Sequence, residues 1–269
     1  MRIEHIDEVL PHVLGRKDFV IGFRDGYTVI DYVYTAEDTF DHPVRLECRG
    51  IKFGPDGRTL ARPFGKFFNI GEKAHTQPHL INLSDPHVLM DKLDGSMIHP
   101  AIVHDRLVLM TRMGHTDVAK KAEQLLTPEL ERGMRQWLEA GTTPILEYTA
   151  PTNRIIIKYE QPQLTLLALR ETLSGTYLPY VCVANRAHLW GIEAVPMVPP
   201  AWGRIDDFLG HVRALKGKEG YVLWFPESNV WLKVKGEDYV TKHRAKDSIT
   251  LEKNALALVL TNGLDDVMP

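Results

Sequence analysis

The sequence lacks the features that would place a chain in a membrane or direct it out of the cell. No stretch reaches about 18 consecutive apolar residues, the length that a membrane-spanning helix requires. The first residues, Met1–His5, lack the apolar core of a secretory signal. We therefore expect no membrane association and a cytoplasmic location.

Cysteine is almost absent, with only Cys48 and Cys182 in 269 residues. Two cysteines allow at most one disulfide, and both lie in apolar stretches that are typical of strands. Buried free thiols in a reducing compartment are therefore expected. The 12 histidines form no cluster with cysteine at metal-ligand spacing, so no structural zinc site is expected.

The sequence also has no excess of positive charge. Its net charge is −3, with 44% hydrophobic and 25% charged residues, which is the composition of an ordinary globular protein. A broad basic surface for nucleic acid is thus not indicated, and any basic surface has to be local, as in a cleft. The length suits one large domain or two small ones.

Alternating apolar residues separated by turn signals predict many strands in hairpins. The expected strands are 19–23, 27–34, 46–53, 59–64, 98–103, 107–111, 144–149, 155–159, 163–170, 176–183, 221–225 and 230–234. Helical spacing predicts helices at 3–14, 117–126 with Asp117 as N-cap, 128–140, 206–215 and 248–260. Hairpins with interspersed helices indicate an α+β fold with antiparallel sheets.

One stretch, Met90–Ile98, has the pattern of a strand, a tight Asp94-Gly95 turn and a second strand. Lys92 stands where the first strand ends, so its ammonium can project into a cleft. Gly95 lets the backbone approach a bulky ligand because it has no Cβ. The alternative is a surface lysine before an ordinary hairpin turn.

Two upstream cations stand among apolar residues. Arg49 lies in an expected strand, where a buried charge needs either a structural carboxylate partner or a phosphate that its planar guanidinium can grip. Lys66 is flanked by Phe64, Phe67 and Phe68. These rings either pack in a core while the ammonium reaches solvent, or they wall a nucleotide pocket.

Downstream, Lys233 and Lys235 are two residues apart on an expected strand, so both ammoniums leave the same face of the sheet. Like charges on one face repel unless an anion lies between them. The alternatives are a solvated face and a phosphate contact. Glu147, in an apolar strand, either forms a buried ion pair with an arginine or holds a ligand.

These segments occur in a fixed order: Glu47–Phe53, Ala61–Asn69, Met90–Ile98, Leu146–Tyr148, Lys218–Val222 and Trp231–Lys235. Together they resemble the covalent nucleotidyltransferases, which include ATP-dependent polynucleotide ligases and capping enzymes. The Arg-Gly-Ile-x-Phe and Lys-Phe-Phe-Asn segments are similar to the bacteriophage RNA ligase 1 group, over residues 30–245. The resemblance implies an adenylyltransferase domain of antiparallel sheets flanked by helices at 1–240, with a short helical extension at 241–269.

The resemblance also implies a reaction. The Lys92 amine attacks the α-phosphate of ATP, the AMP passes to an RNA 5′-phosphate, and a 3′-hydroxyl displaces the AMP. A lysine amine is ordinarily protonated and inert at neutral pH, and nearby cations or a magnesium ion would activate it. ATP, Mg²⁺ or Mn²⁺, and single-stranded RNA ends are the implied cofactors and partners, with single-stranded DNA left open. A monomer is expected.

The resemblance implies three catalytic roles and a set of ATP-binding residues. Lys92 is the nucleophile, Lys233 and Lys235 assist at the α-phosphate, and Glu219 is the metal-associated carboxylate. The implied ATP-binding residues are Tyr32, Arg49, Lys66, Phe68, Asp94, Gly95, Arg112, Glu147, Lys233 and Lys235. Arg112 stands where many relatives have lysine, and the spacing leaves Tyr32 and Tyr34 as alternatives for one nucleotide contact.

Three other functions stay open at this stage. A DNA ligase or a capping-type guanylyltransferase would normally carry an additional OB-fold module, for which this chain offers no room. A non-catalytic protein that binds nucleotides or RNA ends is the third. Because only residues 236–269 follow the Lys-x-Lys strand, we expect a ligase for simple single-stranded ends rather than for a folded RNA.

Overall fold

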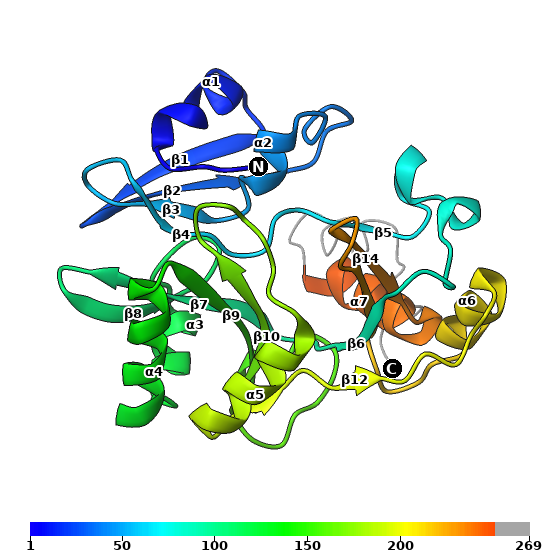
Figure 1. Ribbon diagram of the computed structural model, residues 1–269. Helices are drawn as coiled ribbons and strands as arrows, with labels where there is room; N and C mark the ends of the chain where they lie inside the picture. Colours follow the sequence, from blue (N-terminus) through cyan, green and yellow to red (C-terminus); the bar gives the residue numbers. More distant parts are fainter. Residues whose placement is uncertain (251–269) are drawn as a thin grey trace.

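The computed structural model describes residues 1–250, and it contains three β-sheets (Figure 1). The first sheet has the order β1-β2-β3-β4 and is antiparallel throughout. Its strands are β1 (Phe19–Arg24), β2 (Tyr27–Tyr32), β3 (Ile51–Phe53) and β4 (Thr59–Ala61). The short helices η1 (Ile6–Glu8), α1 (Leu10–Val13) and α2 (Pro43–Glu47) contribute to one apolar core with it.

The second sheet has the order β11-β10-β9-β7-β8. Its strands are β7 (Ser96–Val103), β8 (Arg106–Met110), β9 (Thr142–Thr149), β10 (Gln163–Glu171) and β11 (Glu193–Ala194). The helices α3 (Asp117–Glu123), α4 (Pro128–Glu139) and α5 (Tyr180–Trp190) pack against it around the largest apolar core. The 3-10 turn η4 (Pro151–Asn153) follows β9.

The third sheet has the order β12-β6-β13-β14-β5. Its strands are β5 (Phe68–Asn69), β6 (Val88–Lys92), β12 (Met197–Val198), β13 (Gly220–Phe225) and β14 (Val230–Lys235). The helix α6 (Ile205–Arg213) packs on it, and α7 (Glu237–Thr250) follows β14. The turns η2 (Ala74–Thr76) and η3 (Pro78–Leu80) lie between β5 and β6.

The Lys92 stretch joins two of these sheets. Its strand-turn-strand prediction is confirmed, but β6 pairs with β12 and β13, whereas β7 pairs with β8 and β9. The turn is therefore a crossing between the second and third sheets and not a hairpin. This places Lys92 at the junction of two sheets, where a cavity can form.

The predicted α+β class is confirmed, and most of the expected strands are present within one or two residues. The expected strand over 46–53 is wrong in its first half, because Pro43 opens helix α2 and the His42 ring accepts a hydrogen bond from Val44 N–H. Arg49 consequently lies in a loop after α2. The expected strand over 176–183 is also wrong, since α5 begins immediately after Pro179.

Two smaller predictions differ from the structure, and a third is untested. Residues 155–157 form bends and 158–159 are irregular instead of a strand, and the backbone of this segment is held by a carboxylate described below. The N-cap of α3 is Thr116, whose hydroxyl accepts from Ala119 N–H, and Asp117 is the first helical residue. The expected helix at 248–260 lies almost wholly outside the described residues.

Both cysteines are free thiols, as expected, but Cys48 follows α2 and Cys182 lies within α5, so neither is in a strand. Within residues 1–250, no helix is long and apolar enough to cross a membrane.

Candidate active site

A cavity of about 640 Å³ lies where the three sheets meet. Strand β2 contributes Asp31 and Tyr32, β6 contributes Lys92, and β14 contributes Lys233. Its other lining residues are Val33, Arg49, Phe64, Phe67, Met90, Asp91, Leu93, Gly95, Ser96, Met97, Thr111, Arg112, Met113, Thr116, Glu147, Leu167, Val195, Val222 and Trp231. Most of the residues that the sequence pattern singled out are thus brought into one place.

Glu219, which directly precedes β13, links the two lysines that end the strands on either side of β13. Its Oε1 lies 2.8 Å from Lys92 Nζ and 3.0 Å from Lys235 Nζ. Strand register produces this arrangement, because Gly220 is paired with Lys92 on β6 and with Lys235 on β14. A Cβ on Gly220 would lie 2.0 Å from Val234 O, so glycine is required beside this ion-pair network.

Lys233 is a buried cation of the cavity with other cations close to it. Burial and the nearby charges of Lys66, Arg49 and Lys92 lower the pKa of Lys233 to about 7. Its Nζ lies 5.5 Å from the centre of the Phe67 ring. A half-neutralised ammonium among other cations indicates a place for an anion, which favours the phosphate interpretation over a solvated face.

Glu147 reaches the cavity from β9 and faces the turn that follows Lys92. Its Oε1 accepts a hydrogen bond from Gly95 N–H at 3.1 Å, and burial raises its pKa to about 7. A Cβ on Gly95 would lie 2.4 Å from Tyr148 O, which explains the glycine. Within the described residues Glu147 makes no ion pair with an arginine, so the structural alternative is not supported.

Arg49 enters the cavity from the loop after α2. Its Nη1 donates weakly to Phe64 O at 3.4 Å and lies 3.5 Å from Met97 Sδ. Across residues 1–250 its guanidinium forms no ion pair with a carboxylate, and burial followed by the charge of Arg112 lowers its pKa. An unneutralised, buried guanidinium in a cavity is suited to phosphate oxygens.

The structure distinguishes the two candidate tyrosines. Tyr32 lines the cavity, whereas the exposed Tyr34 does not. Arg112 lies 4.2 Å from the Tyr32 ring centre and donates from Nε and Nη2 to Asp31 Oδ1 at 3.2 and 2.9 Å. Burial acts to raise the pKa of Tyr32, but Arg112, Lys66 and Arg49 together lower it. Arg112 therefore occupies the cavity wall with an internal counterion.

Four of the expected ATP-binding residues do not line the cavity, namely Lys66, Phe68, Asp94 and Lys235. Lys66 lies behind Tyr32, with its Nζ 4.8 Å from the Tyr32 ring centre and 5.0 Å from that of Phe40. Phe68 is 4% exposed and packs edge-on against Phe40 in the core of the first sheet. The two alternatives for the rings around Lys66 were a core and the wall of a pocket. Each is partly met, because Phe64 and Phe67 line the cavity whereas Phe68 lies in the core.

Asp94 is also turned away from the cavity. It is 1% exposed, and its Oδ2 accepts from Ile156 N–H and Ile157 N–H at 2.7 and 2.6 Å. Its Oδ1 accepts from the Tyr239 hydroxyl at 2.6 Å. This carboxylate ties the Lys92 turn to the loop after β9 and to α7, so it holds the position of the nucleophile's turn.

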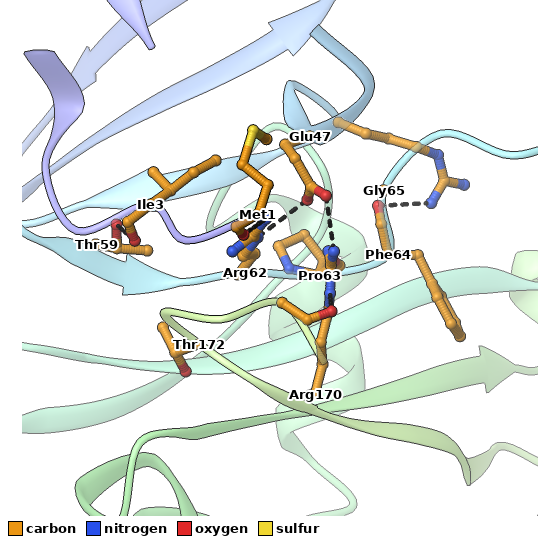
Figure 2. Close-up of polar contacts among 12 residues, drawn as sticks. Met1, Ile3, Glu47, Thr59, Arg62, Pro63, Phe64, Gly65, Arg170 and Thr172 are labelled. Carbon is orange, nitrogen blue, oxygen red and sulfur yellow. Dashed lines mark hydrogen bonds and ion pairs between the residues drawn. The ribbon is translucent and has the colours of Figure 1, made fainter. Parts of the chain in front are cut away.

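A buried ion triad supports the wall that carries Arg49 and Phe64 (Figure 2). Arg62 Nε donates to Glu47 Oε2 at 3.0 Å, and Arg170 Nη2 donates to Glu47 Oε1 at 2.8 Å. Arg170 also donates to Pro63 O at 2.6 Å. Burial acts against the ionised carboxyl, but the two guanidiniums lower the pKa of Glu47 to about 2. The sequence showed Glu47 only as part of a motif, and its partners lie far away along the chain.

Lys52, on β3, lies beneath the cavity and has no exposed surface. Its ammonium donates to the carbonyl oxygens of Gly50, Thr111 and Arg112 at 2.7, 2.7 and 2.9 Å, and His99 Nε2 is 2.9 Å away. Sequence reasoning missed this residue, although a lysine inside the apolar run Ile51–Phe53 was the available signal. Lys52 fixes the backbone on which Arg112 stands.

We expect Lys52→Met to be strongly destabilising, because the methionine fills the space but removes three hydrogen bonds to carbonyl oxygens, of which, within the described residues, Thr111 O alone keeps a second donor, Gly114 N–H. At about 1 kcal/mol or more for each carbonyl, the loss is about 3 kcal/mol. In a chain of this size, that corresponds to a fall in melting temperature of roughly 6–12 °C. Thermal unfolding would measure it, with Lys121→Met on the exposed side of α3 as control. Equal melting temperatures for the two variants would contradict this role.

The site fits a divalent cation only if substrate phosphates complete its coordination. Among the residues that the structure describes, no group of three or more His, Cys, Asp or Glu side chains is placed to hold a metal ion. Glu219 is nevertheless a buried carboxylate at the mouth of the site, and Mg²⁺ is commonly held by one or two carboxylates together with substrate phosphates. The donor set therefore fits a metal that arrives with a nucleotide.

A family model described as RNA ligase matches residues 47–248. A putative RNA ligase of Thermovibrio ammonificans is 36% identical over 177 residues, covering 64% of this chain and 46% of the relative. RNA ligase 1 of bacteriophage TS2126 is 31% identical over 214 residues, covering 74% and 52%. The chain thus spans about half the length of the curated relatives it matches.

Solved structures show the same fold. An archaeal ATP-dependent RNA ligase superposes with a TM-score of 0.64 at 17% identity, covering 94% of this chain and 68% of that one. A putative ATP-dependent DNA ligase from Aquifex aeolicus gives 0.64 at 16% identity, covering 95% and 71%. The expected nucleotidyltransferase fold is therefore confirmed. Because the family model covers residues 47–248, most of the sequence, this chain belongs to the RNA ligase family.

Proposed function

We propose that this protein is an ATP-dependent RNA ligase that works through a lysyl-adenylate on Lys92. The observation that carries the proposal is the position of the Lys92 amine. It stands beside a cavity of about 640 Å³, is paired with Glu219, and faces a wall that carries Lys233 and Arg49. This is an arrangement for holding a polyphosphate against an amine.

In the first step Lys92 Nζ forms a bond to the α-phosphorus of ATP, the bond to the bridging oxygen breaks, and pyrophosphate leaves. The attacking amine loses one proton to solvent as the bond forms, and the phosphoramidate product keeps one N–H. Lys233 and Arg49 offset charge on the phosphate oxygens as the transition state forms. A bound divalent cation would add Lewis-acid stabilisation of the same oxygens from the Glu219 side.

In the second step an oxygen of the RNA 5′-phosphate attacks the same phosphorus, and the Lys92 amine leaves, taking up a proton. In the third step a 3′-hydroxyl attacks the 5′-phosphorus, so that AMP leaves and the phosphodiester forms. Glu147, which carries a pKa of about 7 and lies beside the Lys92 turn, is placed to contact the ribose of the nucleotide as an acceptor or a donor.

The cheapest test uses ATP or GTP labelled at the α-phosphate, with no RNA present. Label should become bound to the protein from ATP and not from GTP. Addition of single-stranded RNA with a 5′-phosphate should then release AMP and give a sealed product. A protein that binds ATP but takes up no label would contradict the proposal, and transfer from GTP alone would indicate a capping-type reaction. Sealing of DNA alone would indicate a DNA ligase.

The pKa of Lys233 predicts how polyphosphate affinity depends on pH. Burial and neighbouring cations lower this pKa to about 7, whereas a bound anion favours the protonated form. Below pH 7 the ammonium is already charged. Above pH 7 binding must take up a proton, so affinity for pyrophosphate should fall between pH 7 and pH 9, by up to about tenfold for each pH unit.

Calorimetric titration with pyrophosphate at pH 6.5 and 8.5 would measure this effect, in two buffers of different ionisation enthalpy. Lys233→Met should bind more weakly at both values and lose the proton uptake. Glu147→Gln is the matched control, since Glu147 titrates in the same range but should leave the Lys233 part of the slope intact. An unchanged slope in Lys233→Met would contradict the assignment.

A further inference from the structure

A second cavity, of about 630 Å³, lies between the loop after β9 and helix α7. It is lined by Arg154, Ile155, Ile156, Ile157, Lys158, Gly217, Lys242 and Lys246, and we refer to it as the basic groove. Four of these eight residues are cations and none is acidic. The net charge of the protein is −3, so a basic surface was expected only locally, and the groove is such a local concentration of positive charge.

The carboxylates beside the groove are weak competitors for an incoming anion. Lys158 is paired with Glu160 at 3.1 Å and Lys242 with Asp238 at 2.8 Å, and the lysine side chains are 66% and 58% exposed. Exposed ion pairs of this kind contribute little free energy to stability, and salt screens them. A polyanion could therefore replace these partners.

The walls of the groove are fixed to each other. Lys246 Nζ, on α7, donates to Ile155 O at 2.7 Å and to Arg154 O at 3.2 Å. Arg154 Nε donates to Ile156 O at 3.0 Å, which curls the loop on itself. The loop and α7, which carry the cations of the groove, are thus held together.

The groove is attached directly to the turn that carries the nucleophile. Asp94 stands two residues after Lys92, and its carboxylate accepts hydrogen bonds from the backbone N–H groups of Ile156 and Ile157. Asp94 N–H donates to the Tyr159 hydroxyl at 3.0 Å. The groove therefore lies against the turn that follows Lys92, on the side to which the Asp94 carboxylate points.

We propose that the basic groove binds the phosphodiester backbone of the RNA strand whose end is presented to Lys92. This inference rests on the proposed ligase function. Arg154 and Lys158 contact phosphates from the loop, and Lys242 contacts them from α7. The three half-buried isoleucines provide an apolar floor against which riboses and bases lie.

The test removes two groove charges without touching the first cavity. In the double variant Lys158→Gln/Lys242→Gln both residues are exposed and lose only exposed ion pairs, with Glu160 and Asp238, so folding should be unaffected. Transfer of AMP from ATP to the protein should keep its normal rate. Sealing of RNA that already carries a 5′-adenylate should need about 10- to 30-fold more RNA for half-maximal rate at 0.1 M salt, because about two phosphate contacts are lost.

A matched control is Lys121→Gln/Arg132→Gln, which removes two exposed cations from α3 and α4. It should seal like the unsubstituted protein. The plot of log affinity against log salt should become shallower by about 1.4 for the groove variant alone, at roughly 0.7 for each lost phosphate contact. Equal behaviour of the two double variants would overturn the proposal.

Failure of the proposed function is recognised separately, as absence of AMP transfer in the unsubstituted protein. RNA binding needs no chemistry, so fluorescence anisotropy with a single-stranded RNA bearing a 5′-hydroxyl tests the groove in that case as well. Weaker binding by the groove variant than by the control variant supports the proposal. Binding that is identical for both variants, or absent from the unsubstituted protein, overturns it.

Discussion

Lys92→Ala protein should take up no AMP from ATP, whereas the unsubstituted protein should gain the mass of one AMP. The bond is a phosphoramidate, so the added mass should be lost in acid and retained in alkali. The physical reason is that the Lys92 amine is the proposed nucleophile, and binding of ATP by other residues cannot replace the covalent bond that this amine would form. Intact-protein mass spectrometry, followed by peptide mapping, would measure the gain and place it.

The sharpest competitor for this role is Lys233. Its pKa of about 7 means that its amine is partly free at neutral pH, and it lines the same cavity. Lys92 nevertheless stands at the crossing of two sheets, lines the same cavity and has its Nζ 2.8 Å from Glu219 Oε1. An adduct mapped to Lys233 would end the assignment of Lys92.

Two further variants separate chemistry from structure. Lys92→Arg keeps a positive charge beside Glu219 but has no amine that forms a stable adenylate, so it should bind ATP and gain no mass. Lys218→Ala removes a neighbouring exposed lysine that is paired with Asp91 at 2.9 Å, and it should adenylylate normally. Loss of AMP uptake in Lys218→Ala would show that the effect of substitution is not specific to Lys92.

The sequence was sufficient to find the residues that lie on regular strands. Lys92, Glu147, Lys233 and Lys235 were all expected on strands, and strand alternation alone put the last two on one face. Local patterns of this kind do not depend on distant parts of the chain. This is why the α+β class and the cluster of cations could be predicted without a structure.

Other parts of the site depend on contacts between distant residues. Asp31 neutralises Arg112 across 81 positions, and Arg170 reaches Glu47 across 123, so neither pair has a local signature. Asp94 was expected at the nucleotide because of its motif, but its carboxylate is occupied by Ile156, Ile157 and Tyr239. Which side of a turn a carboxylate faces is decided by tertiary packing.

Helix and loop assignments failed for a related reason. The stretch before Arg49 is apolar enough for a strand, but Pro43 has the fixed φ of a helix start and the stretch folded as α2. Arg49 is therefore on a loop, where its guanidinium can enter the cavity without a carboxylate partner. The error in secondary structure explains why the phosphate interpretation of Arg49 is stronger than the strand pattern suggested.

Glu219→Gln should slow AMP transfer to Lys92 by about 10²–10³-fold, by analogy with the loss of a preorganised charge elsewhere. The carboxylate is 3% exposed and lies within 3.0 Å of the ammoniums of Lys92 and Lys235. Glutamine keeps its volume but leaves the two cations facing each other without an anion. It also removes a buried carboxylate that fits a divalent cation, so half-maximal rate should require more Mg²⁺.

Single-turnover transfer of label from α-labelled ATP, over a Mg²⁺ titration, would measure both effects. Glu237→Gln is the matched control, because Glu237 is an exposed carboxylate at the start of α7, only two residues beyond Lys235. Melting temperature should be followed in parallel, since two unpaired ammoniums also destabilise the fold. A Glu219→Gln protein that stays folded and transfers AMP at the normal rate would show that the network around Lys92 does not organise the reaction. A rate loss rescued by high Mg²⁺ would instead assign Glu219 mainly to holding the cation.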